Sequence, residues 1–413
     1  MERRRVVITG LGAVTPIGLT AMESWQAVKD GVCGVAPITQ FDPTGMKVQL
    51  AAEVKGFVPE NYMSKPEAKR MARFTQLAVV SAKEALENAG FTLDAAEAAR
   101  CGVSVSSGIG GRFLTAAAHD KGTQTGGDRG SPFYIPMGIC NMAAGQIAIH
   151  TGFRGMCSCP VTACTGGTNA VGDAFHYIRD GYADVMLCGG AESAVTPLAI
   201  GAFTSMKALT QNPDPDRASI PFDAERSGFV LGEGAAILLL EELEHAKARG
   251  ARIYAEVVGY GATCDAYHMT APRPDGSGGA KAMEMAIADA GAKPEDVDYI
   301  NAHGTSTPLN DAGETAAVKT VFGDHAYQLA ISSTKSMTGH MLGAAGAVEA
   351  LFCALALQEG FLPATIHYQV PDPACDLDVV PNQGRSADLR YALSNSLGFG
   401  GHNGSLLFKK WEA

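Results

Sequence analysis

Apolar runs and amphipathic stretches alternate along the whole chain. Runs that are apolar on both faces predict buried strands, and stretches with apolar positions three or four residues apart predict helices. Four helices are expected, each closed by glycine, at residues 74–90, 169–181, 280–291 and 343–360. Strands are expected at residues 6–10, 103–106, 184–190, 235–240, 253–261, 299–302, 329–333 and 391–396. This alternation predicts an α/β protein whose mixed, largely parallel sheets are sandwiched between helices.

Two of the expected helices have similar sequences. Cys164 lies 17 residues before Gly181, and Gly343 lies 17 residues before Gly360. Both helices begin with small residues and then read A-V-x-x-A, and each is followed by an apolar strand and a glycine-rich turn. This self-similarity predicts an internal duplication of a βα unit of the thiolase kind.

Composition limits the possible functions. The chain has 413 residues, of which 46% are hydrophobic, which is enough for a large core and suggests two or three domains. A net charge of -11 argues against a general nucleic-acid binder. A charged fraction of only 18% is consistent with surface that is buried in an oligomer.

The cysteine pattern and the N-terminus bear on the compartment. Ten scattered cysteines, without a pair of C-x-x-C sequences, argue against structural zinc and against a disulfide framework, and favour the reducing cytosol. The first apolar run is too short for a signal peptide, and we expect no run of the ~18 apolar residues that would span a membrane. A G-x-G sequence at Gly10–Gly12 lacks the third glycine of a dinucleotide site and is interpreted as structural.

Cys164 is the first candidate catalytic residue. It follows a short apolar run and precedes a glycine-rich helix start at Gly166 and Gly167. The first backbone N–H groups of a helix are unpaired and the helix dipole is positive there, so this position should favour the thiolate. A cysteine taken alone is more often a buried structural residue, and the interpretation depends on partners elsewhere in the chain.

Two histidines and a lysine provide such partners. His303 ends one expected strand, and His340 lies shortly after another, where ligands bind in α/β sheets. Lys335 lies five residues before His340 and, if buried, needs a carboxylate, which Glu314 or Glu349 could supply. The S-x-x-K sequence that ends at Lys335 is also found in penicillin-recognising serine enzymes, but no K-T-G follows it.

Four motifs together identify a family. They are T-A-C at 162–164, H-G-T-x-T-x-x-N-D-x-x-E at 303–314, K-S-x-x-G-H at 335–340 and G-F-G-G-x-N at 398–403. With them the chain resembles the β-ketoacyl-acyl-carrier-protein synthases, closest to the elongating type II enzymes of bacterial fatty acid synthesis, over nearly its whole length. The resemblance implies a thiolase-like fold with an α-β-α-β-α layered core. The nucleophile would lie in the half formed by residues 1–252, and the His/Lys machinery in residues 253–413.

The resemblance also implies a reaction. Cys164 would accept an acyl chain, and a malonyl unit would then lose CO₂ and condense with it, which lengthens the chain by two carbons. His303 and His340 would stabilise the enolate, and Lys335 would add positive charge and fix the histidine loop. The backbone N–H groups of Cys164 and Phe399 would form the oxyanion hole, and the Phe399 ring would gate the second substrate.

Further residues have roles that are implied only by the resemblance. Thr305, Thr307 and Thr270 would bind the pantetheine arm of the carrier, and Ile109 would line the acyl tunnel. Glu314 and Glu349 would give structural support. No metal or organic cofactor is expected, since the phosphopantetheine arrives on the carrier protein.

The expected partner is acyl carrier protein, in its acyl- and malonyl-loaded forms. Lys65, Lys69, Arg129 and Lys207 are the candidate docking residues. A cytoplasmic homodimer is expected from the family, with residues 131–133 as a candidate contact region.

Three alternatives remain. A ketosynthase of a polyketide or specialised-lipid pathway has almost the same motifs. A non-catalytic chain-length factor lacks the cysteine, so Cys164 argues against it. A degradative thiolase needs a second active cysteine, and the surroundings of Cys375 do not fit that role. The sequence also departs from the family at Thr165-Gly166, beside the nucleophile, where the floor of the acyl pocket could differ.

Overall fold

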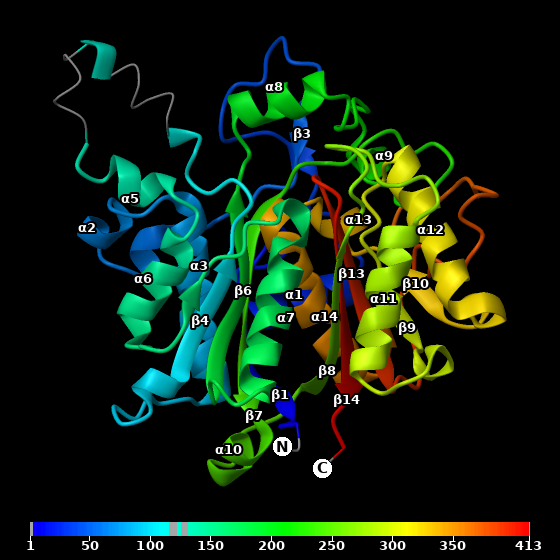
Figure 1. The fold of residues 1–413 in the computed structure, drawn as a ribbon. Helices are drawn as coiled ribbons and strands as arrows, with labels where there is room; N and C mark the ends of the chain where they lie inside the picture. The colour runs from blue at the N-terminus through cyan, green and yellow to red at the C-terminus, as the bar shows by residue number, and fades with distance from the viewer. Residues whose placement is uncertain (1–2, 115–121, 125–130, 413) are drawn as a thin grey trace.

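The computed structural model describes residues 3–114, 122–124 and 131–412, and one large sheet organises this part of the chain (Figure 1). Ten strands are hydrogen-bonded in the order β10-β9-β13-β14-β8-β1-β7-β6-β4-β5. They are β1 Val6–Val14, β4 Cys101–Ser106, β5 Cys157–Ser158, β6 Val185–Ser193, β7 Glu233–Glu242, β8 Ala255–Cys264, β9 Tyr299–Asn301, β10 Ala330–Ser332, β13 Tyr391–Gly398 and β14 His402–Lys410. Two small ribbons pair β2 (Ala36–Pro37) with β3 (Leu50–Ala51), and β11 (Phe361–Leu362) with β12 (Arg385–Ser386).

The sheet consists of two halves with the same topology. The order β1-β7-β6-β4-β5 in one half corresponds to β8-β14-β13-β9-β10 in the other. In both halves the first two pairings are antiparallel and the last two are parallel. This repeated order confirms the duplication that the echoing helices predicted. The halves are joined edge to edge by only three residue pairs, between Val6–Ile8 of β1 and 255–257 of β8.

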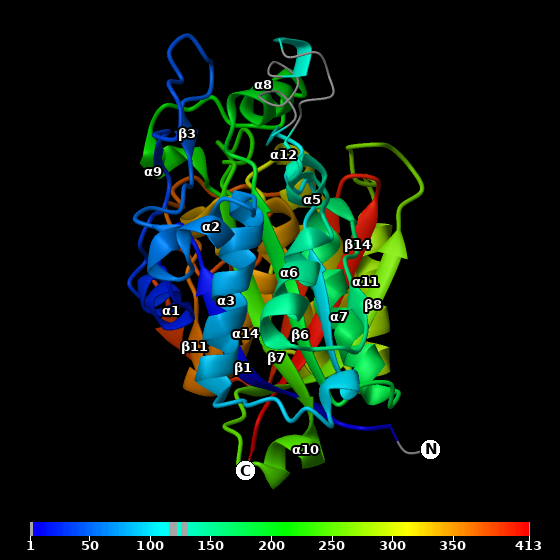
Figure 2. The same ribbon diagram turned by 90° about the vertical axis from the view of Figure 1, so that its left-hand side faces the viewer.

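Helices complete five layers. α7 (Gly166–Arg179) and α14 (Ala345–Glu359) pack against strands of both halves and form the central layer. α3 (Arg73–Ala89) and α6 (Met142–Thr151) cover the outer face of the first half, while α11 (Ser277–Asp289) and α12 (Pro308–Phe322) cover that of the second (Figures 1 and 2). The α-β-α-β-α expectation is therefore confirmed. The shorter helices are α1 Ala21–Lys29, α2 Lys65–Ala68, α5 Tyr134–Gly138, α8 Pro197–Ser205, α9 Pro215–Ala218, α10 Leu243–Ala248 and α13 Lys335–Thr338.

The central helix α14 is apolar all round because it is enclosed on every side. Every residue from Ala345 to Leu357 is buried. Among the described residues, one stretch, Leu342–Glu359, is long and apolar enough to cross a membrane, and 89% of it is buried inside the protein. This stretch includes Glu349, Gln358 and Glu359, so it is not an unbroken apolar run. Its composition is that of a helix enclosed between two half-sheets.

Glycines mark the places where elements approach closely. A Cβ at Gly10 would lie 2.2 Å from the carbonyl oxygen of Ala85, and one at Gly12 would lie 2.0 Å from that of Ser81. The G-x-G sequence therefore lets α3 pack directly on β1, as its structural interpretation predicted. In the central layer, a Cβ at Gly346 of α14 would lie 2.1 Å from Oγ1 of Thr168 in α7.

The other expected elements are present, with a few differences. α3 and α14 end at Gly90 and Gly360, which adopt left-handed conformations. Helix α12 and strand β14 were not expected, and the loop at 211–227 contains the short helix α9. Residues 119–131 are polar and glycine-rich, which predicts a loop, and this stretch lies mostly outside the described residues.

Candidate active site

Cys164 lies in a tight turn that leads directly into α7. The turn is a 3-10 segment, Ala163–Thr165, in which Ala163 has the unusual φ of 51°. The thiol is 8% exposed, and burial raises its pKa to about 12. The positive charge of Lys335 and the backbone N–H groups of Phe399 and Cys164 act in the opposite direction. The expectation that the helix start yields a thiolate was wrong for the free enzyme, because desolvation outweighs these groups.

The two histidines lie against each other. His303 follows β9 and His340 follows α13, and their ring centroids are 5.2 Å apart at an interplanar angle of 86°. Burial, and secondly the charge of Lys335, lowers the pKa of each imidazole well below 6.5. Both rings are therefore neutral at neutral pH. The Nδ1 atoms of both have no hydrogen-bond partner within the described part of the chain.

Lys335 forms a buried ion pair with Glu349 of α14. The lysine is 1% exposed and the glutamate 2% exposed, and Nζ contacts Oε1 directly. Burial raises the pKa of Glu349, whereas the lysine charge lowers it. Of the two carboxylates that the sequence offered as the partner of Lys335, the structure selects Glu349.

Glu314 instead holds the histidine loop. Its two carboxylate oxygens accept hydrogen bonds from the backbone N–H groups of His303 and Gly304, each at 2.8 Å. Burial raises the pKa of Glu314 to about 7. Gly304 has a φ of +33°, and a Cβ there would lie 2.5 Å from that of Ser333. The bend that directs His303 into the site therefore requires glycine.

The glycine-rich turn between β13 and β14 meets the nucleophile. A Cβ at Gly398 would lie 3.2 Å from the backbone nitrogen of Cys164, so the two backbones are in close contact. The backbone N–H of the next residue, Phe399, acts on the Cys164 thiol. The Phe399 ring packs near Phe203, with their centroids 6.4 Å apart. The backbone N–H groups of Phe399 and Cys164 therefore both lie near the thiol.

The active-site cavity has a volume of about 510 Å³ and is lined by residues of both halves of the chain. The lining includes Cys164, His303, His340 and Phe399, and every residue expected to bind substrate. The candidates for substrate binding are Ile109, Thr270, Thr305 and Thr307. The docking candidate Lys207 also lines the cavity. The hydroxyl oxygens of Thr305 and Thr307 are 3.0 Å apart. Cys375, the residue that a thiolase would need, is buried elsewhere in the core.

The remaining docking candidates do not gather at the cavity. Lys65 is the first residue of α2, and Lys69 directly follows this helix. Helix α2 lies beside α6, where Oε1 of Glu67 is 3.7 Å from Nε2 of His150. Figures 1 and 2 both place α2 well apart from α8, the helix that precedes Lys207. Arg129 lies outside the described residues.

Sequence reasoning missed Glu192, a buried carboxylate at the end of β6. It accepts hydrogen bonds from Ser107 Oγ at 2.9 Å and from the N–H groups of Gly108, Ile109 and Gly343 at 2.8, 3.2 and 3.1 Å. It therefore ties the loop that lines the cavity to the start of α14. An acidic residue that ends a strand apolar on both faces was the available signal.

The departure at Thr165 does not shape the cavity floor. Its side chain is fully buried and donates a hydrogen bond to the carbonyl oxygen of His402 at 3.1 Å. Neither Thr165 nor Gly166 lines the cavity. A Cβ at Gly166 would lie 2.0 Å from Ser106 Oγ, so this glycine lets α7 pack on β4.

A cysteine at a helix start and two neutral histidines share one cavity with Phe399, and the buried Lys335 acts on the thiol and on both imidazoles through its charge. On this fold, such a set of groups is that of a condensing enzyme of the thiolase-like class. Family models confirm this class. The beta-ketoacyl synthase N-terminal domain matches residues 3–246 and the C-terminal domain matches residues 254–369. The chain belongs to the beta-ketoacyl synthase family.

Individual proteins are similar to the chain over nearly its whole length. The chain is 51% identical over 413 residues to 3-oxoacyl-[acyl-carrier-protein] synthase 2 of Synechocystis sp., covering 100% of this chain and 99% of the relative. It is 50% identical over 412 residues to the protein of the same name from Staphylococcus aureus strain COL, with 100% of each covered. Among solved structures it is similar to a chain of AntDE:AntF, described as a type II PKS acyl-carrier protein in complex with its ketosynthase. That match has a TM-score of 0.88 and 36% identity, and covers 99% of this chain and 100% of the other.

Proposed function

We propose that the chain is the elongating β-ketoacyl-acyl-carrier-protein synthase of fatty acid synthesis. It joins a malonyl unit to an acyl chain held on Cys164 and releases CO₂. The observation that carries the proposal is the cavity in which Cys164, His303, His340 and the backbone N–H of Phe399 meet. Full-length identity of 50–51% to 3-oxoacyl-[acyl-carrier-protein] synthase 2 proteins supports it.

In the first stage the thiol of Cys164 attacks the acyl thioester of the carrier. Because burial keeps the thiol protonated, its proton must leave as the new bond forms, and the neutral imidazoles in the cavity are suitable acceptors. The N–H groups of Cys164 and Phe399 hold the oxyanion. The carrier thiol leaves with a proton, and the acyl chain remains on sulfur.

In the second stage malonyl-carrier protein enters and its C–C bond breaks. The electron pair left by CO₂ moves into an enolate, whose oxygen accepts hydrogen bonds from His303 and His340. The enolate carbon then attacks the acyl thioester, and Cys164 leaves as the thiolate, which takes up one proton from solvent to restore the thiol. Lys335 helps because its charge favours that thiolate and keeps both imidazoles neutral.

The substrate arm reaches the site from the mouth of the cavity. Thr305 and Thr307 bind the phosphopantetheine, Thr270 adds a contact, and Ile109 faces the acyl chain. The phosphopantetheine belongs to the carrier, so the enzyme itself needs no cofactor. The carrier docks on basic residues, of which Lys207 at the cavity supports this assignment most directly, with Lys65, Lys69 and Arg129 as further candidates.

The enzyme acts as a cytoplasmic homodimer in this proposal. Support comes from exposed apolar side chains near the edge strand β5, including Ile135, Ile139, Ile149 and Val161. Phe133, in the expected contact region, is 37% exposed. The division into residues 1–252 and 253–413 stays a prediction.

The direct test is substitution of the nucleophile. Cys164→Ala should form no β-ketoacyl product from acyl- and malonyl-carrier protein while its circular dichroism spectrum and thermal midpoint stay close to wild type. Cys157→Ser, at an exposed cysteine on β5, is the matched control and should elongate normally. Normal product formation by Cys164→Ala in a mass assay would contradict the proposal.

The pathway is tested by the products. Carrier proteins loaded with saturated acyl chains of graded length should each be extended once by two carbons. A product that carries several unreduced keto groups would instead support the polyketide alternative. A chain-length factor would give no product with any chain length, which the presence of Cys164 argues against.

Docking is tested by reversal of charge. Lys207→Glu should raise KM for carrier-bound substrate far more than for a small acyl thioester, because only the carrier has a protein surface to lose. Equal effects on both substrates would rule out a docking role for this lysine.

A further inference from the structure

The side chains of Cys33, Asp216 and His367 come together outside the active-site cavity. One donor atom of each side chain lies within 4.8 Å of the others, and Nε2 of His367 lies 3.4 Å from Oδ1 of Asp216. They come from the loop after α1, from α9 and from the loop after β11. None of the three lines the active-site cavity.

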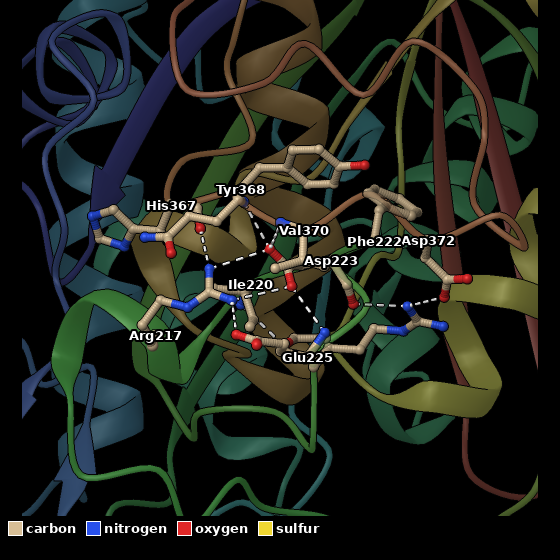
Figure 3. Close-up of polar contacts among 12 residues, drawn as sticks. Arg217, Ile220, Phe222, Asp223, Glu225, His367, Tyr368, Val370 and Asp372 are labelled. Carbon is tan, nitrogen blue, oxygen red and sulfur yellow. Dashed lines mark hydrogen bonds and ion pairs between the residues drawn. The ribbon is translucent and has the colours of Figure 1, made fainter.

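A buried network fixes the segments that carry Asp216 and His367. Arg217 contacts both carboxylate oxygens of the fully buried Asp223, at 3.1 and 3.2 Å, and donates to the carbonyl oxygen of His367 at 2.6 Å (Figure 3). Asp223 also accepts hydrogen bonds from the backbone N–H groups of 369–370 at 2.7 and 2.9 Å. The backbone of the segments that carry Asp216 and His367 is therefore fixed before any ligand arrives.

The His367 ring is unused by this network. Figure 3 shows it directed away from Arg217 and Asp223, although its own carbonyl group takes part. Its Nδ1 atom is buried and has no hydrogen-bond partner within the described residues. Its φ of +63° is costly for a residue with a side chain, and glycine would avoid that cost.

The Cys33 loop is held from the other side. The N–H of Gly34 donates to the carbonyl oxygen of Met337 at 2.8 Å, and that of Val32 donates to Ala27 at 2.9 Å. A Cβ at Gly34 would lie 2.8 Å from the same Met337 oxygen, so the two backbones are in direct contact. Cys33 itself is a free, half-buried thiol.

We propose that Cys33, Asp216 and His367 form a binding site for a divalent transition-metal ion of the Zn²⁺ class. Thiolate, imidazole and carboxylate are the three ligand types that Zn²⁺ takes from proteins, and three of them leave a fourth position for water. Mg²⁺ and Ca²⁺ are disfavoured because they require oxygen ligands. Asp216, whose side chain is 72% exposed, gives the ion a path from solvent.

The ion would connect three segments that all support α13, the helix that begins with Lys335. Gly34 bonds Met337, Ser219 Oγ donates to the carbonyl oxygen of Lys335 at 2.7 Å, and the N–H of Ile366 donates to Ser336 Oγ at 3.1 Å. Each of these residues lies within three positions of a ligand. The site is thus a structural clamp behind the active site, and it is independent of the proposed condensation.

The test uses the full chain and Zn²⁺ alone. All proteins carry Cys164→Ala, because the active-site cysteine and its two histidines are also metal ligands. Metal-free protein is titrated with Zn²⁺ by calorimetry, and bound zinc is counted after gel filtration. The test variants are Cys33→Ser and His367→Asn, since asparagine tolerates a positive φ. Cys157→Ser is the matched cysteine control.

The expected result is one Zn²⁺ per chain in the background protein and in the Cys157→Ser control. Affinity should fall at least about tenfold in each test variant, since even loss of a group that only orients a ligand typically costs 10–100-fold. Co²⁺ should give a thiolate charge-transfer band that disappears with Cys33→Ser. Absence of stoichiometric binding, or equal binding by folded Cys33→Ser and His367→Asn proteins, would overturn the proposal.

Discussion

The buried pair of Lys335 and Glu349 allows stability and catalysis to be separated. In Glu349→Gln the lysine keeps its charge but loses its only ion-pair partner within the described residues. Since Lys335 is 1% exposed, water does not replace the carboxylate. Breaking such a pair from one side costs about 3–5 kcal/mol. That is a large part of the 5–15 kcal/mol that typically separates folded from unfolded protein.

Removal of both charges should have a different effect. Lys335→Met/Glu349→Leu replaces the pair with apolar side chains of similar volume, so neither an unpaired charge nor a large void remains. Such replacements are often neutral or stabilising. We expect the double variant to unfold within about 1 kcal/mol of wild type, or above it. It should nevertheless fail to condense, because the positive charge that acts on Cys164, His303 and His340 is gone.

Urea unfolding followed by circular dichroism measures the first effect, and product formation from acyl- and malonyl-carrier protein measures the second. Glu244→Gln, which breaks an exposed pair with Lys247, is the control and should change stability by no more than about 0.5 kcal/mol. The reasoning is refuted if the double variant is as unstable as Glu349→Gln, or if it condenses at the wild-type rate.

Three further predictions concern the same site. His303→Ala and His340→Ala should each still be acylated on Cys164, because the remaining imidazole can accept the thiol proton, but should fail to condense, because the enolate needs both donors. Mass spectrometry of the intact protein measures acylation, and equal loss of both steps would contradict this division. Gly398→Ala places a methyl group 3.2 Å from the backbone nitrogen of Cys164. Displacement of this oxyanion donor should slow acylation about 10²–10³-fold in a single-turnover assay. An unchanged rate would show that this turn does not contribute to the oxyanion hole. The folded-state pKa of His340 lies below its unfolded value of about 6.5, so its contribution to stability is complete above that pH and is lost as pH falls below it. Urea midpoints should therefore fall less steeply below pH 6.5 in His340→Asn than in wild type. Parallel curves for the two proteins would exclude this linkage.

Periodicity could predict the fold wherever burial was uniform. β6 is apolar on both faces as far as Ala191, and α14 is apolar on nearly every face and is closed by Gly360. α12 was missed because its first turns carry the polar motif that includes Asn310, Asp311 and Glu314, which conceals the helical period. Pro308 at its first position was a start signal that was not used.

The candidate site could be predicted as a set of residues but not as an electrostatic environment. Strand ends and a helix start indicated His303, His340 and Cys164 one by one, and the family motifs joined them. The pKa of the thiol was predicted in the wrong direction because the helix start is visible in sequence and the depth of burial is not. The choice of Glu349 over Glu314 as the partner of Lys335 also depends on tertiary packing alone.

The duplication within a single chain also allows its two halves to carry different catalytic groups. The turn before α14 is a 3-10 segment with Leu342 at φ 46°, the counterpart of Ala163 at φ 51° before α7. Gly343 occupies the position that corresponds to Cys164, and a Cβ there would lie 2.5 Å from the nitrogen of Gly108. Two identical copies related by a symmetry axis would have to carry a thiol at both turns or at neither. Fusion into a single polypeptide removes that restriction, so one turn can carry the reactive sulfur while its twin gives up its side chain to make room.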